Sequence, residues 1–574
     1  MSWEQVYQLW KENENLESHL KEELSVLAEN KTELEDAFYA PLEFGTAGMR
    51  GILGPGINRM NIYTIRQATE GLARFMDTQD PETKRRGVAI AYDCRHFSPE
   101  FAMEAAKTLA KHNIPSFVFE SLRPTPELSF AVRYLKAFTG IMITASHNPA
   151  NYNGYKVYGE DGGQMPPADA DALTKFVREV ANPLEVEVLS EEEAKHSGLI
   201  NIIGEEVDRA YLEQVKSVTI NQALVDEMGK ELKLVFTPLH GTGKMLGEKA
   251  LKQAGFEKFV IEPSQAVADP NFSTVKSPNP EEHSAFEYAM KLGQKEDADV
   301  LIATDPDADR LGAAVRLPDG SYQVLTGNQI GAIMTKYILT AHKEAGTLQA
   351  NATIVKSIVS SELPAAIAKS FGATTFNVLT GFKFIAEKIQ QFEDTGSNTF
   401  MFGFEESYGY LVKSFVRDKD AIQALVLLAE VAAYYKKQGK TLYDGLQEIF
   451  EEYGYYAEKT ISVTLSGLEG AAKIKEMMAT FRQAAPTEFA NIPVAITEDF
   501  QALTKVFVSG EKEALTTPPS NVLKYTLADE SWIAVRPSGT EPKIKFYIGV
   551  KADSSTAANQ KIADLKAAIE AITA

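Results

Sequence analysis

The 574-residue chain contains a single cysteine, Cys94. One thiol excludes an intramolecular disulfide framework and a cysteine-rich metal site, and we expect Cys94 to be a small buried residue. Long apolar runs are missing as well. No segment reaches the ~20 apolar residues that cross a membrane, and residues 1–20 lack the pattern of a signal peptide. These absences predict a soluble, cytoplasmic protein.

Basic residues are outnumbered, because 58 Lys and Arg stand against 79 Asp and Glu and give a net charge of -21. Such a charge favours neither nucleic acid nor an anionic membrane as a partner. An anionic substrate would therefore need a local basic pocket. The hydrophobic fraction of 44% and the charged fraction of 24% are typical of globular proteins. The length exceeds what one hydrophobic core supports and indicates several domains.

Apolar strands and helices alternate along most of the chain. A first round begins with the strand-like segment 86–93, and similar rounds begin at 231–238 and at 328–345. Alternation of this kind predicts α/β layers. After residue 456 the pattern changes to strand, helix, three strands and helix, which indicates a smaller α+β domain.

We therefore expect three similar mixed α/β domains and a C-terminal α+β domain. The first domain includes a charged helical extension of about forty residues. The expected bounds are 1–210, 211–325, 326–455 and 456–574. Nothing in the sequence indicates an oligomeric state.

A serine loop, Thr144-Ala-Ser-His-Asn-Pro149, directly follows an apolar strand. Open α/β sheets bind ligands at the carboxyl ends of their strands, so Ser146 is placed for chemistry. Serine is a weak nucleophile unless a base, a metal or its own phosphorylation activates it, and the neighbouring His147 could orient it. An Asn-Pro turn with a capping serine would look the same in isolation.

An aspartate loop, Asp305-Pro-Asp-Ala-Asp-Arg310, follows another apolar strand. Carboxylates at alternating positions can converge on one hard cation, and Mg²⁺ prefers such oxygen ligands. Arg310 cannot bind the metal but can pair with a phosphate or a carboxylate. An acidic turn is the plainer reading. It would crowd three like charges unless a cation lay between them.

Two further loops carry polar side chains. Residues 403–409 contain Glu405 and Ser407, which could hydrogen-bond to sugar hydroxyls or form an ordinary solvated turn. Residues 536–545 combine a guanidinium, hydroxyls, a glycine and lysines, a set that can bind an anion. The anion-binding candidates are Arg536, Ser538, Gly539, Thr540 and Lys545.

These four loops, in this order, resemble those of the α-D-phosphohexomutase superfamily, the phosphoglucomutase and phosphomannomutase relatives. The resemblance covers the chain from Gly45 to about Tyr547. It implies four domains around a cleft, with one loop from each. It also implies that Ser146 carries the phosphoryl group and that Mg²⁺ is bound by Ser146, Asp305, Asp307 and Asp309.

The resemblance assigns further roles. Glu405 and Ser407 would read the sugar hydroxyls, and the 536–545 loop would bind the phosphate that is not transferred. His147, Lys156 and Lys419 are candidates for proton transfer. Other implied substrate contacts are Arg50, Arg310, Thr380 and Lys383.

The sugar loop favours one substrate. Its Glu-Glu-Ser sequence is similar to the glucose-type loop, which implies interconversion of α-D-glucose 1-phosphate and glucose 6-phosphate, with glucose 1,6-bisphosphate as intermediate and activator. Phe404 departs from that pattern, since many phosphoglucomutases have glycine there. This form and the N-terminal helices also resemble the branch that includes phosphopentomutases, so pentose and mannose phosphates stay open as substrates.

Two other functions fit parts of the sequence. Asp305-x-Asp307 after a strand has the local shape of a phosphatase that forms an aspartyl phosphate, but that function leaves Ser146 and the 536–545 loop unexplained. A sugar-phosphate sensor without turnover is the second. The intact serine and aspartates argue against it.

Overall fold

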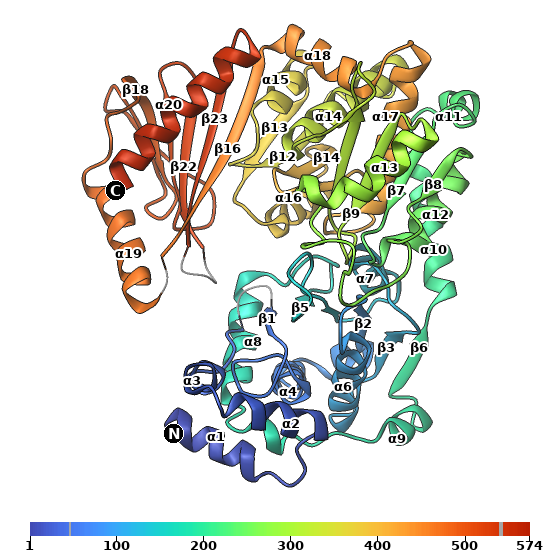
Figure 1. Cartoon of the computed structure of the whole chain (residues 1–574), viewed down its shortest axis with the longest axis vertical. Coiled ribbons are helices and arrows are strands. Elements are labelled where there is room, and N and C mark those ends of the chain that lie inside the picture. Colours follow the sequence, from blue (N-terminus) through green and yellow to red (C-terminus); the bar gives the residue numbers. More distant parts are fainter. Residues whose placement is uncertain (45–47, 466, 539–542, 574) are drawn as a thin grey trace. The chain divides into compact units, whose positions relative to one another are not determined.

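The computed structural model describes residues 1–44, 48–465, 467–538 and 543–573. The chain divides into two compact units (Figure 1). Unit 1 comprises Met1–Thr326 and Ser407–Leu442, and unit 2 comprises Gly327–Glu406 and Tyr443–Ala574. Each unit contains two sheets that help to position the site residues.

The first sheet of unit 1 has a parallel centre and an antiparallel edge. β2 and β4 are mostly apolar and buried along their whole length, as expected for central parallel strands. The antiparallel β1 and β5 extend the sheet beyond β4. The strand order is β1 (Gly48–Ile52), β5 (Tyr152–Tyr158), β4 (Thr139–Ile143), β2 (Val88–Tyr92), β3 (Ser116–Phe119) and β6 (Ile200–Ile203).

Helices cover this sheet through one continuous apolar core. Ile65 and Leu72 come from one helix, Phe101 from another and Leu173 from a third, and all pack with sheet residues such as Ile141. The helices are α4 (Ile62–Asp77), α6 (Ser98–Lys111) and α8 (Pro167–Glu179), with α7 (Thr125–Tyr134) contacting β2 and β4.

The N-terminal extension forms three helices that pack near α4 (Figure 1). A capping box at Ser2 begins the first helix. Trp10 and Phe38 form an apolar cluster that reaches Tyr63 of α4. The helices are α1 (Trp3–Glu12), α2 (Ser18–Leu27) and α3 (Lys31–Phe38).

The second sheet of unit 1 again places its most apolar strand in the middle. β9 pairs with β7 in parallel and with β10 in antiparallel orientation. The strand order is β11 (Tyr322–Val324), β10 (Leu311–Arg316), β9 (Val300–Thr304), β7 (Leu234–Thr237) and β8 (Phe259–Ile261). The helices α12 (Gly243–Ala254), α13 (Glu287–Glu296) and α17 (Ala421–Lys437) pack around it.

Unit 2 contains a parallel sheet and a larger antiparallel sheet. In the parallel sheet β12 (Ala352–Ser357) lies between β13 (Thr374–Val378) and β14 (Thr399–Glu405). Three helices accompany these strands, namely α14 (Gly327–Glu344), α15 (Leu363–Ser370) and α16 (Phe382–Thr395).

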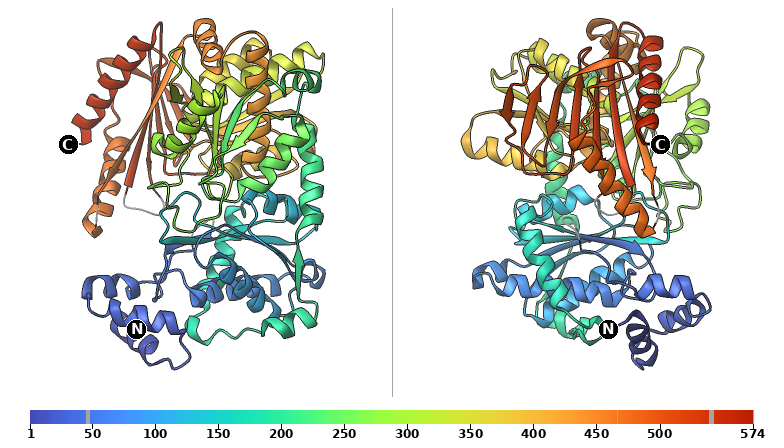
Figure 2. Two further views of the ribbon diagram at one scale, coloured as in Figure 1. Left: turned by 45° about the vertical axis from the view of Figure 1, so that its right-hand side comes forward. Right: turned by 90° about the vertical axis from the view of Figure 1, so that its left-hand side faces the viewer.

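The antiparallel sheet of unit 2 packs two helices against one face (Figure 2). The helices α19 (Gly467–Gln483) and α20 (Ser555–Thr573) contribute residues to the same core cluster as β21 to β23. The main strand order is β16 (Tyr455–Thr464), β23 (Lys543–Ala552), β22 (Trp532–Pro537), β21 (Leu523–Leu527), β18 (Ile492–Asp499), β19 (Thr504–Phe507) and β20 (Lys512–Ala514).

The predicted fold class, mixed α/β with a distinct C-terminal α+β region, is confirmed. The sequence did not predict β18, which is interrupted by Pro493, or the short strands β19 and β20, of which β19 is half-buried and β20 exposed. Cys94 is half-buried where we expected a buried residue, since it lies in the turn after β2. In the part of the chain that the structure describes, no helix is both long and apolar enough to cross a membrane.

Candidate active site

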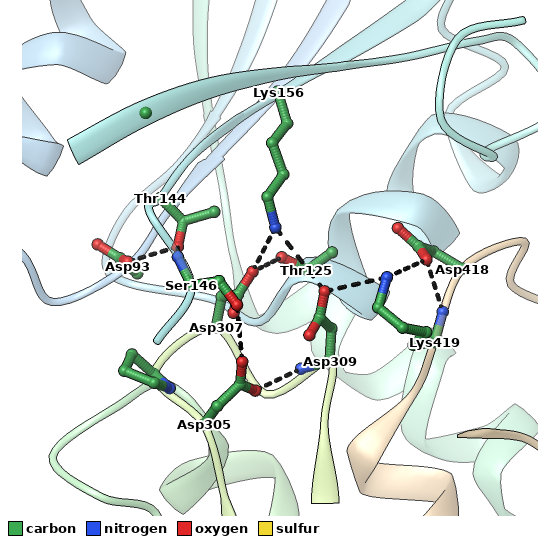
Figure 3. A network of polar contacts seen from close by, with 12 residues as sticks. Asp93, Thr125, Thr144, Ser146, Lys156, Asp305, Asp307, Asp309, Asp418 and Lys419 are labelled. Carbon is green, nitrogen blue, oxygen red and sulfur yellow. Dashed lines mark hydrogen bonds and ion pairs between the residues drawn. The ribbon is translucent and has the colours of Figure 1, made fainter. Parts of the chain in front are cut away.

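Polar loops from both sheets of unit 1 meet at the carboxyl ends of β2, β4 and β9 (Figure 3). β4 ends at Ile143, three residues before Ser146, and β9 ends at Thr304, directly before Asp305. The Ser146 hydroxyl donates a hydrogen bond of 2.8 Å to Asp305 Oδ2. Two of the predicted site loops, 159 residues apart in sequence, are therefore in direct contact.

Ser146 has an unusual backbone conformation. Its φ is 52°, in the left-handed region that non-glycine residues seldom adopt. Its N–H donates to Thr144 Oγ1 at 2.9 Å, and only 3% of the residue is exposed. Strain of this kind persists where the surrounding structure enforces it, commonly at active sites.

Asp305, Asp307 and Asp309 converge as the sequence predicted. Each is buried and offers a carboxylate oxygen, and these oxygens lie within 4.8 Å of one another. Asp305 Oδ1 is fixed by the N–H groups of Asp309 at 3.1 Å and Arg310 at 3.0 Å. Among the described atoms, Asp307 Oδ1 and Asp309 Oδ1 are buried without a hydrogen-bond partner.

The three buried carboxylates repel one another unless positive charge lies nearby. Burial and the neighbouring charges of Asp307 and Asp309 raise the pKa of Asp305 well above its ordinary value. Burial also disfavours the charged form of Asp307, but the Lys156 ammonium outweighs it and holds the pKa of Asp307 well below its usual range. The two orphaned carboxylate oxygens and the all-oxygen donor set fit a hard divalent cation.

Two lysines contact the aspartates. Lys156 Nζ, on β5, lies 2.8 Å from Asp307 Oδ2 and 3.7 Å from Asp309 Oδ2. Lys419 Nζ lies 3.3 Å from Asp309 Oδ2 and 2.8 Å from Asp418 Oδ1 (Figure 3). Carboxylates bind the side-chain nitrogens of both lysines, and each nitrogen can donate further hydrogen bonds.

His147 lies next to the serine, with Nδ1 3.3 Å from Ser146 Oγ. Burial and the positive charges of Arg310 and Arg50 lower the pKa of His147 well below its ordinary value. The imidazole is therefore neutral at pH 7. Arg50 donates to Asn148 Oδ1 at 2.8 Å, and Arg310 Nη1 lies 3.1 Å from Glu281 Oε1.

In unit 2, Glu405 contacts the turn that carries two other predicted substrate residues. Glu405 ends β14 and is buried, and its Oε1 accepts the Gly381 N–H at 2.6 Å. That bond joins Glu405 to the turn that carries Thr380 and Lys383. Within the described chain the Thr380 hydroxyl is buried without a hydrogen-bond partner. Ser407 lies two residues before β15 (Gly409–Leu411) and belongs to unit 1.

The predicted phosphate loop connects β22 and β23. Arg536 and Lys545 lie opposite each other in the antiparallel register, and both are half-buried. The Ser538 N–H donates to Lys543 O at 2.7 Å and closes the hairpin. Gly539 and Thr540 lie outside the residues that the structure describes.

Three supporting residues were not predicted. Thr125 Oγ1 donates to Asp307 Oδ2 at 2.8 Å, Asp418 holds Lys419, and Asp93 Oδ2 accepts the Thr144 hydroxyl at 2.6 Å. Asp93 follows the apolar strand β2, so the strand-end signal that identified Ser146 could have found it. Thr125 is 182 residues from Asp307, and no local pattern connects the two.

Comparison with known proteins identifies the family. Four models of phosphoglucomutase/phosphomannomutase domains match: α/β/α domain I over residues 41–183, domain II over 209–318, domain III over 326–453 and the C-terminal domain over 490–565. Curated phosphoglucomutases from Staphylococcus aureus strains MW2 and COL are 40% identical over 561 residues, which is 97% of this chain and 97% of theirs.

Solved structures share the fold. A phosphoglucomutase/phosphomannomutase family protein from Burkholderia thailandensis has a TM-score of 0.65 at 18% identity and covers 92% of this chain and 97% of its own. The open form of the exocytosis-sensitive phosphoprotein pp63/parafusin (phosphoglucomutase) from Paramecium has a TM-score of 0.68 at 17% identity, covering 93% and 95%. Matches in all four domains and 40% identity over nearly the whole length confirm the resemblance, and the chain belongs to the phosphoglucomutase/phosphomannomutase family.

Proposed function

We propose that this chain is a phosphoglucomutase, an isomerase that interconverts α-D-glucose 1-phosphate and glucose 6-phosphate through phosphorylated Ser146. The observation that carries the proposal is the 2.8 Å contact between the Ser146 hydroxyl and Asp305 at the edge of the aspartate group. The name of the Staphylococcus aureus relatives supports the glucose substrate.

The proposed cofactor is Mg²⁺, held by Asp305, Asp307, Asp309 and an oxygen on Ser146. When bound, the ion would supply positive charge to the phosphoryl group during transfer. The carboxylate oxygens that lack partners among the described atoms support this assignment.

The transfer step breaks the bond between the Ser146 oxygen and phosphorus and forms a bond from phosphorus to a sugar hydroxyl oxygen. The proton of that hydroxyl goes to a base, for which His147 is one candidate, and the departing Ser146 oxygen takes up a proton that restores the serine hydroxyl. Lys156 and Lys419 are the other candidates for proton transfer, and as ammonium groups they would donate the proton in the reverse direction. Arg50 and Arg310 add positive charge for the phosphate.

The bisphosphorylated sugar, glucose 1,6-bisphosphate, is then the intermediate. It must turn round so that its other phosphate faces Ser146. Glu405 and Ser407 would bind the sugar hydroxyls, with Thr380 and Lys383 as further contacts. The other phosphate would be bound by Arg536, Ser538, Gly539, Thr540 and Lys545.

A coupled assay tests this function. Glucose 1-phosphate, mannose 1-phosphate and ribose 1-phosphate are each supplied with a trace of the matching bisphosphate and with Mg²⁺. We expect the largest kcat/KM for glucose 1-phosphate. A larger kcat/KM for ribose or mannose phosphate would reassign the substrate to a pentose or to mannose and keep the mechanism. No turnover with any of the three would refute the proposed activity.

A further inference from the structure

One side chain binds three carbonyl oxygens of the serine loop and a fourth at the start of β5. Arg95 Nη1 donates to Pro149 O at 2.8 Å and to Tyr152 O at 3.0 Å. Arg95 Nη2 donates to Ser146 O at 2.6 Å and to Asn148 O at 2.5 Å. Only guanidinium presents so many donors in a fixed plane. Arg95 is 1% exposed, so water cannot take the place of these acceptors.

Arg95 is itself held from two sides. Its side-chain Nε lies 3.3 Å from Asp93 Oδ2, and its backbone N–H donates to Asp93 Oδ1 at 2.9 Å. The ring of Phe272, from the loop that follows β8, lies 5.0 Å from the guanidinium carbon. A buried charge fixed by a partner and covered by an aromatic face has little freedom to move.

Asp93 reaches Ser146 by a second route. Its Oδ2 accepts the Thr144 hydroxyl at 2.6 Å, and Thr144 Oγ1 accepts the Ser146 N–H at 2.9 Å (Figure 3). The Asp93–Arg95 pair therefore controls both the N–H and the carbonyl oxygen of Ser146. These two contacts restrict the φ and ψ rotations on either side of the serine Cα.

We infer that Arg95, supported by Asp93, is a positioning residue that keeps Ser146 in its left-handed conformation and its hydroxyl directed at Asp305. The inference rests on the proposed function, in which Ser146 carries the phosphoryl group. Arg95 touches no reacting atom. Its effect on catalysis passes through the backbone of residues 146–152.

The test replaces Arg95 by lysine, which keeps the charge beside Asp93 but cannot serve four carbonyl oxygens. We expect kcat to fall about 100-fold or more, because small misplacements of a reacting group have effects of that size. KM should change less than about threefold. Amide hydrogen exchange of the loop 146–152 should accelerate, while exchange elsewhere in unit 1 stays near wild type.

Arg66→Lys is the matched control. Arg66 on α4 is a half-buried arginine of unit 1, and its Nε lies 2.6 Å from Glu104 on α6. It should lose some stability and leave kcat and loop exchange unchanged. If Arg95→Lys fails to fold, Thr144→Val removes both the acceptor of the Ser146 N–H and the hydroxyl that donates to Asp93, and it should show the same pattern.

The inference is overturned if loop exchange and kcat in Arg95→Lys, or in Thr144→Val where that variant is used, match wild type. It is also overturned if kcat falls only in proportion to the folded fraction. Loop exchange needs no turnover, so the two proposals fail separately. If the wild-type chain has no mutase activity but loop exchange in Arg95→Lys is still faster than in wild type, the proposed function is refuted. The positioning role of Arg95 then stands.

Discussion

At the scale of single residues, the site of unit 1 is a set of charges that stabilise one another. Lys156 and Lys419 offset the buried aspartates, and Asp418 holds Lys419 in place. The remaining need for positive charge is met in our proposal by a divalent cation. Outside the site, another group of paired charges predicts that the stability of unit 1 depends measurably on pH.

His112 provides that dependence. Its Nε2 lies 2.7 Å from Glu70 Oε2 and its Nδ1 3.0 Å from Asp77 Oδ2, and the hydrogen bond to Glu70 raises the pKa of His112. A raised pKa means that the protonated form stabilises the fold. The stabilisation is complete below the unfolded value of about 6.5 and is lost as pH rises through the folded value.

We therefore expect His112→Gln to cost about 1 kcal/mol at pH 5.5 and much less at pH 9, in line with a partly exposed ion pair. The shift of the urea unfolding midpoint of unit 1 at the two values measures it. Exposed His196 serves as the control, because His196→Gln should show no such difference. An equal loss at both pH values would contradict the assignment.

At the scale of elements, the serine loop depends on a close approach of three strand segments. Gly154 of β5 faces backbone oxygens, since an added Cβ would lie 2.5 Å from Thr144 O and 3.0 Å from Met49 O. Neither oxygen belongs to a flexible side chain, so the strands would have to separate. Overpacking of this kind costs about 1–3 kcal/mol.

Gly154→Ala should therefore lower both the melting temperature of unit 1 and kcat. Thermal unfolding and the coupled assay measure the two effects. Gly159→Ala is the control, because the nearest atom to its added Cβ is the Asp161 carboxylate at 3.2 Å, the end of a flexible side chain. A Gly154→Ala variant as stable and active as Gly159→Ala would show that β5 tolerates displacement.

The sequence predicted those elements and residues whose signal is local. Ser146 and the three aspartates follow apolar strands, and this pattern predicted their position at the carboxyl ends of those strands. Thr125 and Arg95 could not be predicted in the same way, because their roles depend on contacts with distant or turn-shaped segments. The partly exposed strands β18 to β20 were missed for a related reason: pairing with neighbours, not apolar patterning, defines them.

At the scale of the whole molecule, the two units carry different parts of the proposed function. All three aspartates lie in unit 1. Mg²⁺ should therefore raise the unfolding temperature of unit 1 and leave that of unit 2 unchanged. At a Mg²⁺ concentration 100 times its Kd, the free energy of unfolding of unit 1 should rise by about 2.7 kcal/mol.

Scanning calorimetry with and without Mg²⁺ measures the shift, and proteolysis followed by peptide mass spectrometry assigns each transition to a unit. The Asp307→Asn variant should lose most of the shift. A shift confined to unit 2 would contradict the metal assignment.

Unit 2 should govern substrate affinity. Arg536→Ala removes a guanidinium from the proposed phosphate loop. The loss should weaken substrate binding by about 1.5–3 kcal/mol and so raise KM roughly 10- to 150-fold. Arg482→Ala is the control, since Arg482 pairs with Asp499 at 3.1 Å elsewhere in unit 2. Steady-state kinetics compare the two, and an unchanged KM in Arg536→Ala would move the phosphate site to other residues.

The central claim is that Ser146 carries the phosphoryl group. The most direct measurement incubates the protein with glucose 1,6-bisphosphate labelled in its phosphates, locates the label by peptide mass spectrometry, and then adds unlabelled glucose 1-phosphate. We predict an acid-stable phosphate on Ser146 that leaves at least as fast as kcat and is absent from Ser146→Ala. A hydroxylamine-labile phosphate on Asp305, or a phosphate on Ser146 that does not turn over, would contradict the account.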